Sequence, residues 1–290
     1  MDRIAHIRRF NRTVTRQIGA LENPFLGRDR SLGASRVLFE IGSSGIEIRE
    51  LRARLGLDSG YTSRLLRRLE TESLVEIGQS AEDARVRYVT LTAAGLDEVA
   101  TLNRLSDEAV ASILKPLNEK QQTALTEAMD TVERLLRASS VTIKTENPSS
   151  RTARECLAHY YRELAQRFED GFNPDFSISA TPEEMTPPTG YFVVARLHGD
   201  AVGCGALKCH SDYGEIKRMW VAASTRGLGI GRRILLHLEE LARERTLSSV
   251  RLETNKALTE AQSLYRSSGY REVAPFNSES YAHHWFEKTL

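Results

Sequence analysis

The feature that most constrains the fold is a glycine-rich segment, Arg226-Gly-Leu-Gly-Ile-Gly231, in the second half of the chain. A strand-like run over residues 213–221 precedes it, and an apolar stripe with helical spacing follows it at Ile230, Ile234, Leu238 and Leu241. A strand-to-helix turn of this kind exposes backbone N–H groups at the positive end of a helix dipole, which suits phosphate. The segment lacks the Gly-Lys-Ser/Thr ending of a P-loop, and Arg232 breaks the G-x-G-x-x-G dinucleotide pattern. We therefore predict an α/β domain with an anion-binding turn of another kind.

The chain has 290 residues, a length typical of two domains. The first half has mainly helical patterns, whereas the second alternates strand and helix patterns and holds most of the prolines. A long helical pattern stops near Arg137–Ser140. We place the domains at residues 1–139 and 140–290.

Composition excludes several classes of protein. The 40 basic residues nearly balance the 39 acidic ones, so the chain is not strongly basic overall. No apolar run approaches the roughly 18 residues of a membrane helix, and we expect no membrane partner. Three cysteines make no disulfide framework, which favours the cytoplasm. Cys204 and Cys209 lack zinc-ligand partners, and His283 and His284 would point to opposite faces of a strand, so no metal site is predicted.

The N-terminal half contains two short helical patterns joined by a tight turn. Residues 48–55 form the first pattern, Gly56 ends it, and Asp58 can cap a second helix over residues 59–71. Leu65, Leu66 and Leu69 lie on one side of that helix, and Ser63, Arg64, Arg67 and Arg68 lie on another. A hairpin follows over residues 74–91, in which Arg85 and Arg87 share a strand face and Asp83 can brace Arg85.

This order of elements resembles the MarR-type winged helix-turn-helix regulators over residues 1–138. The resemblance implies a mostly α-helical fold, a homodimer, and recognition of half-sites in a pseudo-palindromic DNA operator. The predicted DNA-binding residues are Ser59, Gly60, Tyr61, Thr62, Ser63, Arg64, Arg67, Arg68, Asp83, Arg85 and Arg87. Apolar residues at three- and four-residue steps near both ends of the domain, such as Ile4, Ile7 and Leu136, suit dimerisation, although they could instead cover the domain's own core.

The C-terminal half resembles the GCN5-related N-acetyltransferase (GNAT) family over residues 140–290. The matching segments are residues 215–221, 226–232 and 264–270. The resemblance implies an α/β fold with a central mixed sheet, acetyl-CoA as the acetyl donor and an amine as the acceptor. The predicted cofactor-binding residues are Met219, Trp220, Val221, Arg226, Gly227, Leu228, Gly229, Ile230, Gly231, Arg232, Asn255 and Tyr265.

Three residues are candidates for proton transfer. Tyr265 stands where the family places a general-acid tyrosine, although a core tyrosine would fit the same helical pattern. Glu215 could be the base or bind the substrate ammonium, or could be an exposed strand-end carboxylate. Glu253, twelve residues before Tyr265, is a second candidate base. Many relatives carry Asn where this chain has Leu258, and Asn255 could replace it.

Three functional hypotheses follow. First, the chain could be a DNA-binding regulator fused to an active N-acetyltransferase. Second, it could be a regulator that binds acetyl-CoA or a small effector without turnover. Third, it could be an acetyltransferase whose N-terminal half serves only to form the dimer. The arginines at 64, 67 and 85 argue against the third, and Glu215 with Tyr265 argues against the second. We favour the first.

Overall fold

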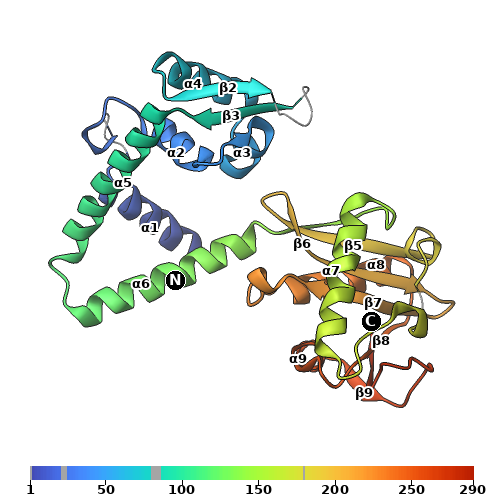
Figure 1. Cartoon of the computed structure of the whole chain (residues 1–290). Coiled ribbons are helices and arrows are strands. Elements are labelled where there is room, and N and C mark those ends of the chain that lie inside the picture. Colours follow the sequence, from blue (N-terminus) through green and yellow to red (C-terminus); the bar gives the residue numbers. More distant parts are fainter. Residues whose placement is uncertain (1, 21–24, 80–85, 179) are drawn as a thin grey trace. The chain divides into compact units, whose positions relative to one another are not determined.

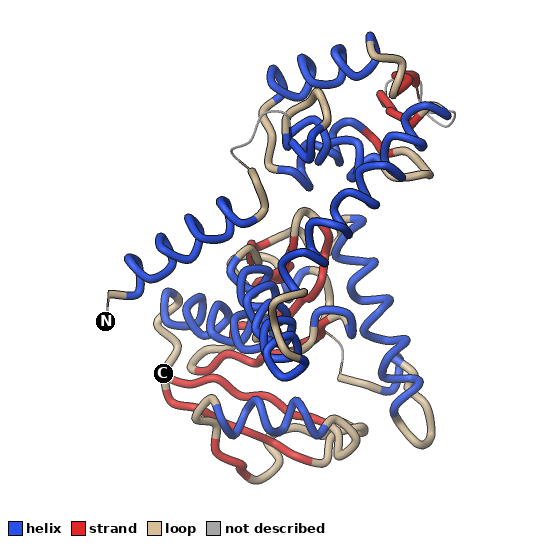
Figure 2. Tube along the Cα trace, turned by 90° about the vertical axis from the view of Figure 1, so that its left-hand side faces the viewer, coloured by secondary structure: helices blue, strands red, loops and turns tan. Residues whose placement is uncertain are grey.

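The computed structural model describes residues 2–20, 25–79, 86–178 and 180–290 (Figure 1). The chain forms two compact units, Met1–Ala128 and Met129–Leu290. The first unit is mostly helical, whereas the second combines a large sheet with helices (Figure 2). The predicted division at 139/140 falls at the end of helix α6 and stays a prediction. Among the described residues, no helix combines the length and apolarity needed to cross a membrane.

The first unit is a set of helices around a small antiparallel sheet of strand order β1-β3-β2. Its helices are α1 (Arg3–Gln17), α2 (Leu32–Ile41), α3 (Ile48–Leu55), α4 (Ser59–Thr71) and α5 (Ala93–Leu114), and α6 (Glu119–Ser139) runs from this unit into the next. Its strands are β1 (Ile46–Glu47), β2 (Val75–Gln79) and β3 (Arg87–Leu91). A one-turn 3-10 segment, η1, covers Phe25–Gly27.

The predicted helix-turn-helix is confirmed, and its boundaries have local causes. Gly56 ends α3 in the left-handed region at φ 64°, which costs glycine little. The Asp58 carboxylate then accepts a hydrogen bond from the Tyr61 N–H at 2.8 Å and caps α4. The apolar side of α4, which includes Leu66 and Leu69, is buried in the core of this unit. The opposite side of α4 therefore remains free to face solvent.

The second unit is a seven-stranded mixed sheet of order β4-β5-β6-β7-β8-β10-β9. Its strands are β4 (Thr142–Thr145), β5 (Gly190–Leu197), β6 (Asp200–Cys209), β7 (Tyr213–Val221), β8 (Ser249–Thr254), β9 (Arg271–Val273) and β10 (His284–Thr289). Its helices are α7 (Arg151–Arg167), α8 (Ile230–Glu244) and α9 (Thr259–Ser267), with 3-10 turns η2 (Pro174–Phe176), η3 (Glu183–Met185) and η4 (Ala223–Thr225). Among the residues that the structure describes, only β7 and β8 pair in parallel, and this mixed sheet confirms the predicted fold class.

Helices cover both faces of this sheet, because the strands are apolar on both sides. Phe192 and Val194 belong to a cluster with Cys156 of α7, whereas Val193 and Ala195 belong to the cluster that contains α8. Helix α8 approaches β6 closely at Gly205. A Cβ atom there would lie 2.8 Å from Ile234 Cγ2 and 3.0 Å from Leu238 Cδ1, so only glycine fits without displacement.

The sheet opens between β7 and β8. Their parallel pairing ends at Glu215 and Arg251, although β7 continues to Val221 and β8 to Thr254. On the other edge of β7 the register with β6 shifts between Cys204 and Ala206, a β-bulge in which Arg218 has φ 57°. The bulge and the separation from β8 both lie on the part of β7 that follows Glu215. Two cavities open beside this part of the strand.

Candidate functional site

The larger cavity, of about 490 Å³, lies between α7, the end of β7, the glycine-rich turn and α9. Its wall combines apolar side chains with the exposed backbone of the turn. The lining residues are Tyr160, Glu163, Leu164, Arg167, Met219, Trp220, Val221, Thr225, Arg226, Gly227, Gly229, Ile230, Gly231, Arg232, Leu258, Glu260, Ala261, Leu264 and Tyr265. Nine of the predicted cofactor-binding residues from 219 to 232 are in this wall. Leu228 is absent from it, because its side chain packs toward the apolar core.

The turn presents backbone N–H groups at the N-terminus of α8. Gly227 and Gly229 adopt φ 81° and 72°, and Gly229 is the N-cap residue that precedes α8. The first backbone bond into the helix runs from Arg233 N–H to Gly229 O at 3.1 Å. The N–H groups of residues 230–232 therefore lie in the first turn, where a helix has no acceptors of its own, and at the positive end of its dipole. This geometry suits an anion such as a pyrophosphate.

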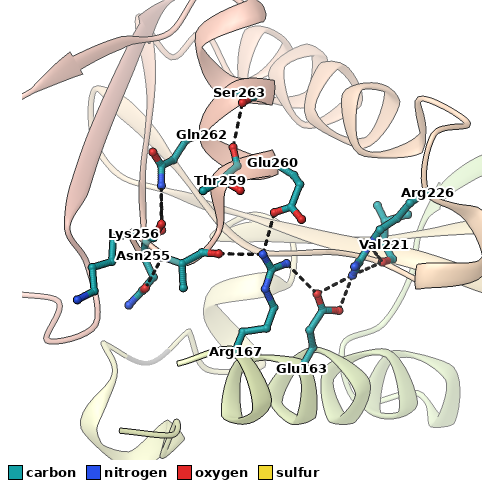
Figure 3. A network of polar contacts seen from close by, with 11 residues as sticks. Glu163, Arg167, Val221, Arg226, Asn255, Lys256, Thr259, Glu260, Gln262 and Ser263 are labelled. Atoms are coloured by element: carbon teal, nitrogen blue, oxygen red, sulfur yellow. Dashed lines mark hydrogen bonds and ion pairs between the residues drawn. The ribbon is translucent and has the colours of Figure 1, made fainter. Parts of the chain in front are cut away.

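A network of ion pairs crosses one side of the larger cavity (Figure 3). Arg226 donates to both Glu163 oxygens at 2.6 Å and to Val221 O at 3.1 Å, which attaches the turn to α7. Arg167 continues the network to Glu260 at 2.8 Å, at the start of α9. The Trp220 indole N–H also donates to Glu163, at 3.1 Å. Sequence reasoning missed Glu163 and Arg167, because their partners are distant in the chain.

The smaller cavity, of about 90 Å³, opens where β7 and β8 separate. Six of its lining residues also line the larger cavity: Tyr160, Leu164, Met219, Leu258, Ala261 and Tyr265. The other lining residues are Phe168, Phe172, Ser177, Ile178, Ile216, Lys217, Arg218, Glu253, Thr254, Asn255, Glu279, Tyr281 and Ala282. The two cavities are therefore neighbours with a common wall.

Tyr265 belongs to that common wall and is 5% exposed. Burial raises the pKa of its phenol well above the ordinary value of 10, so the hydroxyl keeps its proton at neutral pH. Burial also raises the pKa of Tyr160 to about 12, against an opposing effect of Arg218. Two protonated phenols therefore border both cavities.

Three buried charged residues form a cluster at the strand separation. Lys217 contacts Glu253 and lies 3.1 Å from a Glu215 oxygen. Burial raises the pKa of Glu253, and the attraction of Lys217 only partly offsets this effect. Burial acts in the same direction on Glu215, but Lys217 and His210 outweigh it and hold the pKa of Glu215 below its ordinary value. Glu253 thus holds a proton more readily than Glu215 does.

The positions of Glu215 and Asn255 bear on two expectations from the sequence. Glu215 is not an exposed strand-end carboxylate: it is 4% exposed, lines neither cavity, and is bound by His210, Lys217 and Asn277. Asn255 lines the smaller cavity and not the larger one. Its amide nitrogen donates to Tyr281 O at 2.7 Å, and its amide oxygen accepts from Ala257 N–H at 2.9 Å, so it stabilises the local loop.

The predicted DNA-binding residues of α4 separate by exposure. Ser59, Gly60, Ser63, Arg64, Arg67 and Arg68 are exposed, as is Arg87 on β3, and Tyr61 is half-buried. Thr62 is 1% exposed and its hydroxyl donates to Asp58 O at 2.8 Å, so its side chain lies on the buried side of α4 with the leucines, and its predicted DNA contact stays a prediction. Arg68 pairs with Glu72 at 2.8 Å. Asp83 and Arg85 lie outside the described residues.

Two different regions of the chain match known protein families. The acetyltransferase (GNAT) family model matches residues 155–270, and the MarR family model matches residues 27–86. The chain is 34% identical to a protein named "IAA acetyltransferase" from Azospirillum brasilense over 139 residues, which is 47% of this chain and 88% of that protein. It is 38% identical over 63 residues to "HTH-type transcriptional regulator SarZ" from Staphylococcus haemolyticus, covering 22% of this chain and 43% of that protein.

Among solved structures, the chain is similar to a GNAT family acetyltransferase from Elizabethkingia anophelis with acetyl-CoA bound. The TM-score is 0.38 at 17% identity, with 52% of this chain and 99% of that chain covered.

Proposed function

We propose that the chain, which belongs to the GNAT acetyltransferase family through its C-terminal unit and matches the MarR family model over residues 27–86, combines two activities. One is transfer of an acetyl group from acetyl-CoA to an amine, and the other is regulatory binding of double-stranded DNA in the cytoplasm. The observation that carries the enzymatic proposal is the common wall of the two cavities, in which Tyr265 stands. A donor in one cavity and an acceptor in the other would meet at this wall.

The larger cavity fits acetyl-CoA, which would supply a thioester-activated acetyl group. The N–H groups of the turn and of the first turn of α8 would bind its pyrophosphate. The backbone of residues 219–221, at the end of β7, would pair with the pantetheine and polarise the thioester carbonyl. The apolar walls would exclude water from the thioester.

Tyr265 and Glu253 are suited to opposite proton transfers. Tyr265 is protonated at neutral pH and borders both cavities, so it would donate a proton to the departing thiolate. Glu253 lines the acceptor side, and its raised pKa makes it a stronger base than an ordinary carboxylate. Glu253 would therefore remove a proton from the acceptor ammonium, while Glu215 holds Lys217 in place from behind.

Tyr265→Phe tests this assignment. We expect kcat to fall by about 10²- to 10⁴-fold, the usual contribution of a general acid, with little change in acetyl-CoA affinity. Steady-state kinetics and calorimetric titration of acetyl-CoA give the two quantities. Tyr270→Phe is the matched control, because Tyr270 is equally buried but donates to Glu239 at 3.1 Å and lines neither cavity. A kcat unchanged by Tyr265→Phe removes Tyr265 from the mechanism.

The DNA-binding proposal is supported by the exposed arginines of α4. Arg64 and Arg67 extend from the face opposite the buried leucines, where their forked donors suit guanine edges and phosphates. We further propose a homodimer through the N-terminal helices. Helix α1 buries none of its residues, and Ile4 and Ile7 are 70% and 57% exposed. A second copy of the chain would cover these side chains and place two α4 helices on a pseudo-palindromic operator.

A further inference from the structure

Arg218 is a buried cation on the wall of the smaller cavity. It is 6% exposed, and in the described part of the chain its Nε is a buried nitrogen without a hydrogen-bond partner. The bulge in β7 holds it at φ 57°, a left-handed conformation that an arginine seldom adopts. A backbone held in this region is typical of functional sites, where surrounding structure fixes a side chain in place.

The neighbours of Arg218 hold its guanidinium without neutralising it. The guanidinium carbon lies 5.1 Å from the Tyr161 ring centroid and 5.9 Å from that of Tyr160, both on α7. Among the described residues, no carboxylate lies within ion-pair distance of Arg218. Burial of a charge without a counter-ion is costly in free energy. Binding of an anion beside Arg218 would therefore stabilise the buried guanidinium.

The carboxylates of the same cavity are engaged elsewhere. Glu253 contacts Lys217. Glu279 accepts hydrogen bonds from the Ser177 hydroxyl at 2.8 Å and from the Ile178 N–H at 2.7 Å, and thus stabilises a loop. The anion that matches Arg218 must therefore come from a bound molecule.

The bound molecule would occupy the smaller cavity, in which the acceptor is proposed to bind. Arg218 lines the smaller cavity and not the larger one, whereas the glycine-rich turn lines the larger cavity and not the smaller one. The phosphates of the acetyl donor are thus provided with a separate site. Apolar side chains, including Phe168, Phe172 and Ile216, form much of the remaining wall around Arg218.

We propose that the acetyl acceptor is an amine that also carries a carboxylate, namely an amino acid with an apolar side chain, and that its carboxylate binds the guanidinium of Arg218. A carboxylate accepts two parallel N–H bonds from the guanidinium fork, which a neutral group cannot match. This inference rests on the proposed acetyl transfer. In that reaction the amine nitrogen bonds to the acetyl carbon and the carbon–sulfur bond breaks. One of the three ammonium protons stays on the amide nitrogen and two are lost, while the sulfur gains one proton from Tyr265, so one proton is released to solvent overall.

Matched acceptors test the inference on the full-length protein. Leucine and phenylalanine are compared with 3-methylbutylamine and 2-phenylethylamine, which lack only the carboxylate, and with leucinamide, which lacks its charge. We expect kcat/KM to be on the order of a hundredfold higher for the two amino acids, because a buried polar group without its partner penalises the analogue. Arg218→Met should remove most of this preference, mainly by raising KM for the amino acids, and leave the rates with the two amines nearly unchanged.

Two further variants separate recognition from folding. Arg218→Lys keeps the charge without the fork and should retain part of the preference. Arg218→Asn tolerates the left-handed backbone and should behave as Arg218→Met does. Arg271→Met, exposed on β9, is the surface control. Thermal unfolding and acetyl-CoA titration verify that each variant is folded.

The outcomes are distinct. Equal rates with amino acids and amines, or an equal loss with all acceptors in Arg218→Met, overturn the inference and leave the acetyltransferase proposal standing. Failure of wild type to acetylate any of the five acceptors or a wider panel of primary amines, despite binding acetyl-CoA, overturns the proposed transfer and the inference together.

Discussion

Arginine has different roles in the two units of the chain. On α4 of the N-terminal unit, Arg64 and Arg67 are exposed and extend from a helix face opposite the core. In the C-terminal unit, Arg167 and Arg226 are engaged with Glu163 around the larger cavity, and Arg218 is buried beside the smaller one. At these positions, arginine faces solvent on α4 and shapes cavity walls in the C-terminal unit.

The difference has a thermodynamic reason. An exposed guanidinium is hydrated and can exchange water and counter-ions for phosphate without breaking an internal contact, which suits a surface that binds a polyanion. A guanidinium tied to carboxylates holds distant segments together, and its loss leaves the carboxylates without partners. Substitutions in the two units should therefore affect different measurements.

The largest effect on DNA binding is expected for the double variant Arg64→Ala/Arg67→Ala. If each arginine contacts a base or phosphate, each loss costs about 1–3 kcal/mol of operator binding, so the pair should weaken binding by at least tenfold. The dependence of affinity on salt should also become shallower, because fewer counter-ions are released. Fluorescence anisotropy at several salt concentrations measures both quantities.

Arg68→Ala is the internal control for this variant. Arg68 lies on the same helix but is paired with Glu72, so its removal should weaken DNA binding less. Acetyl-CoA affinity should be the same in all three proteins. Operator affinity equal to wild type in the double variant would show that α4 is not the recognition helix.

Local sequence patterns were sufficient to predict several elements in each unit. The helix over 59–71 could be predicted because its cap, Asp58, and its leucine stripe lie within one short segment. The anion-binding turn could be predicted because φ values of 81° and 72° require glycine, and glycines 227 and 229 stand directly before an amphipathic helix. In both cases the physical cause lies within a few neighbouring residues.

The side-chain partners of the site could not be predicted in the same way. Glu163 and Arg226 are 63 residues apart, and Arg167 and Glu260 are 93 apart, so only the folded sheet brings them together. The residue type of Glu215 was compatible with catalysis, but its orientation toward Lys217 and away from both cavities depends on the separation of β7 from β8. The burial of Thr62, by contrast, follows from local spacing, because this residue lies three, four and seven positions before the leucines of the apolar side of α4.

A smaller effect, on acetyl-CoA affinity, is expected for Glu163→Gln in the C-terminal unit. The amide cannot neutralise Arg226 and Arg167, so the glycine-rich turn should be held less firmly against α7. We expect acetyl-CoA affinity to fall by roughly three- to tenfold, equivalent to the loss of about one hydrogen bond. Calorimetric titration measures the change, and Glu155→Gln, which breaks an exposed pair with Arg151, is the matched control. Unaltered affinity would mean that the ion pairs do not support the turn.

The smallest effect concerns Glu215→Gln and its dependence on pH. Burial would raise the pKa of Glu215, but Lys217 and His210 outweigh burial and hold it below the ordinary value of 4.5 that an unfolded chain approaches. A carboxyl group whose pKa is lowered by folding stabilises the folded state above its unfolded pKa, and this stabilisation disappears as the pH falls through the folded pKa. Glu215→Gln should therefore lower the free energy of unfolding by about 1 kcal/mol at neutral pH. The difference from wild type should shrink below pH 4.5. Urea unfolding at a series of pH values measures this difference, and a gap that widens on acidification would contradict the charge-stabilised role of Glu215.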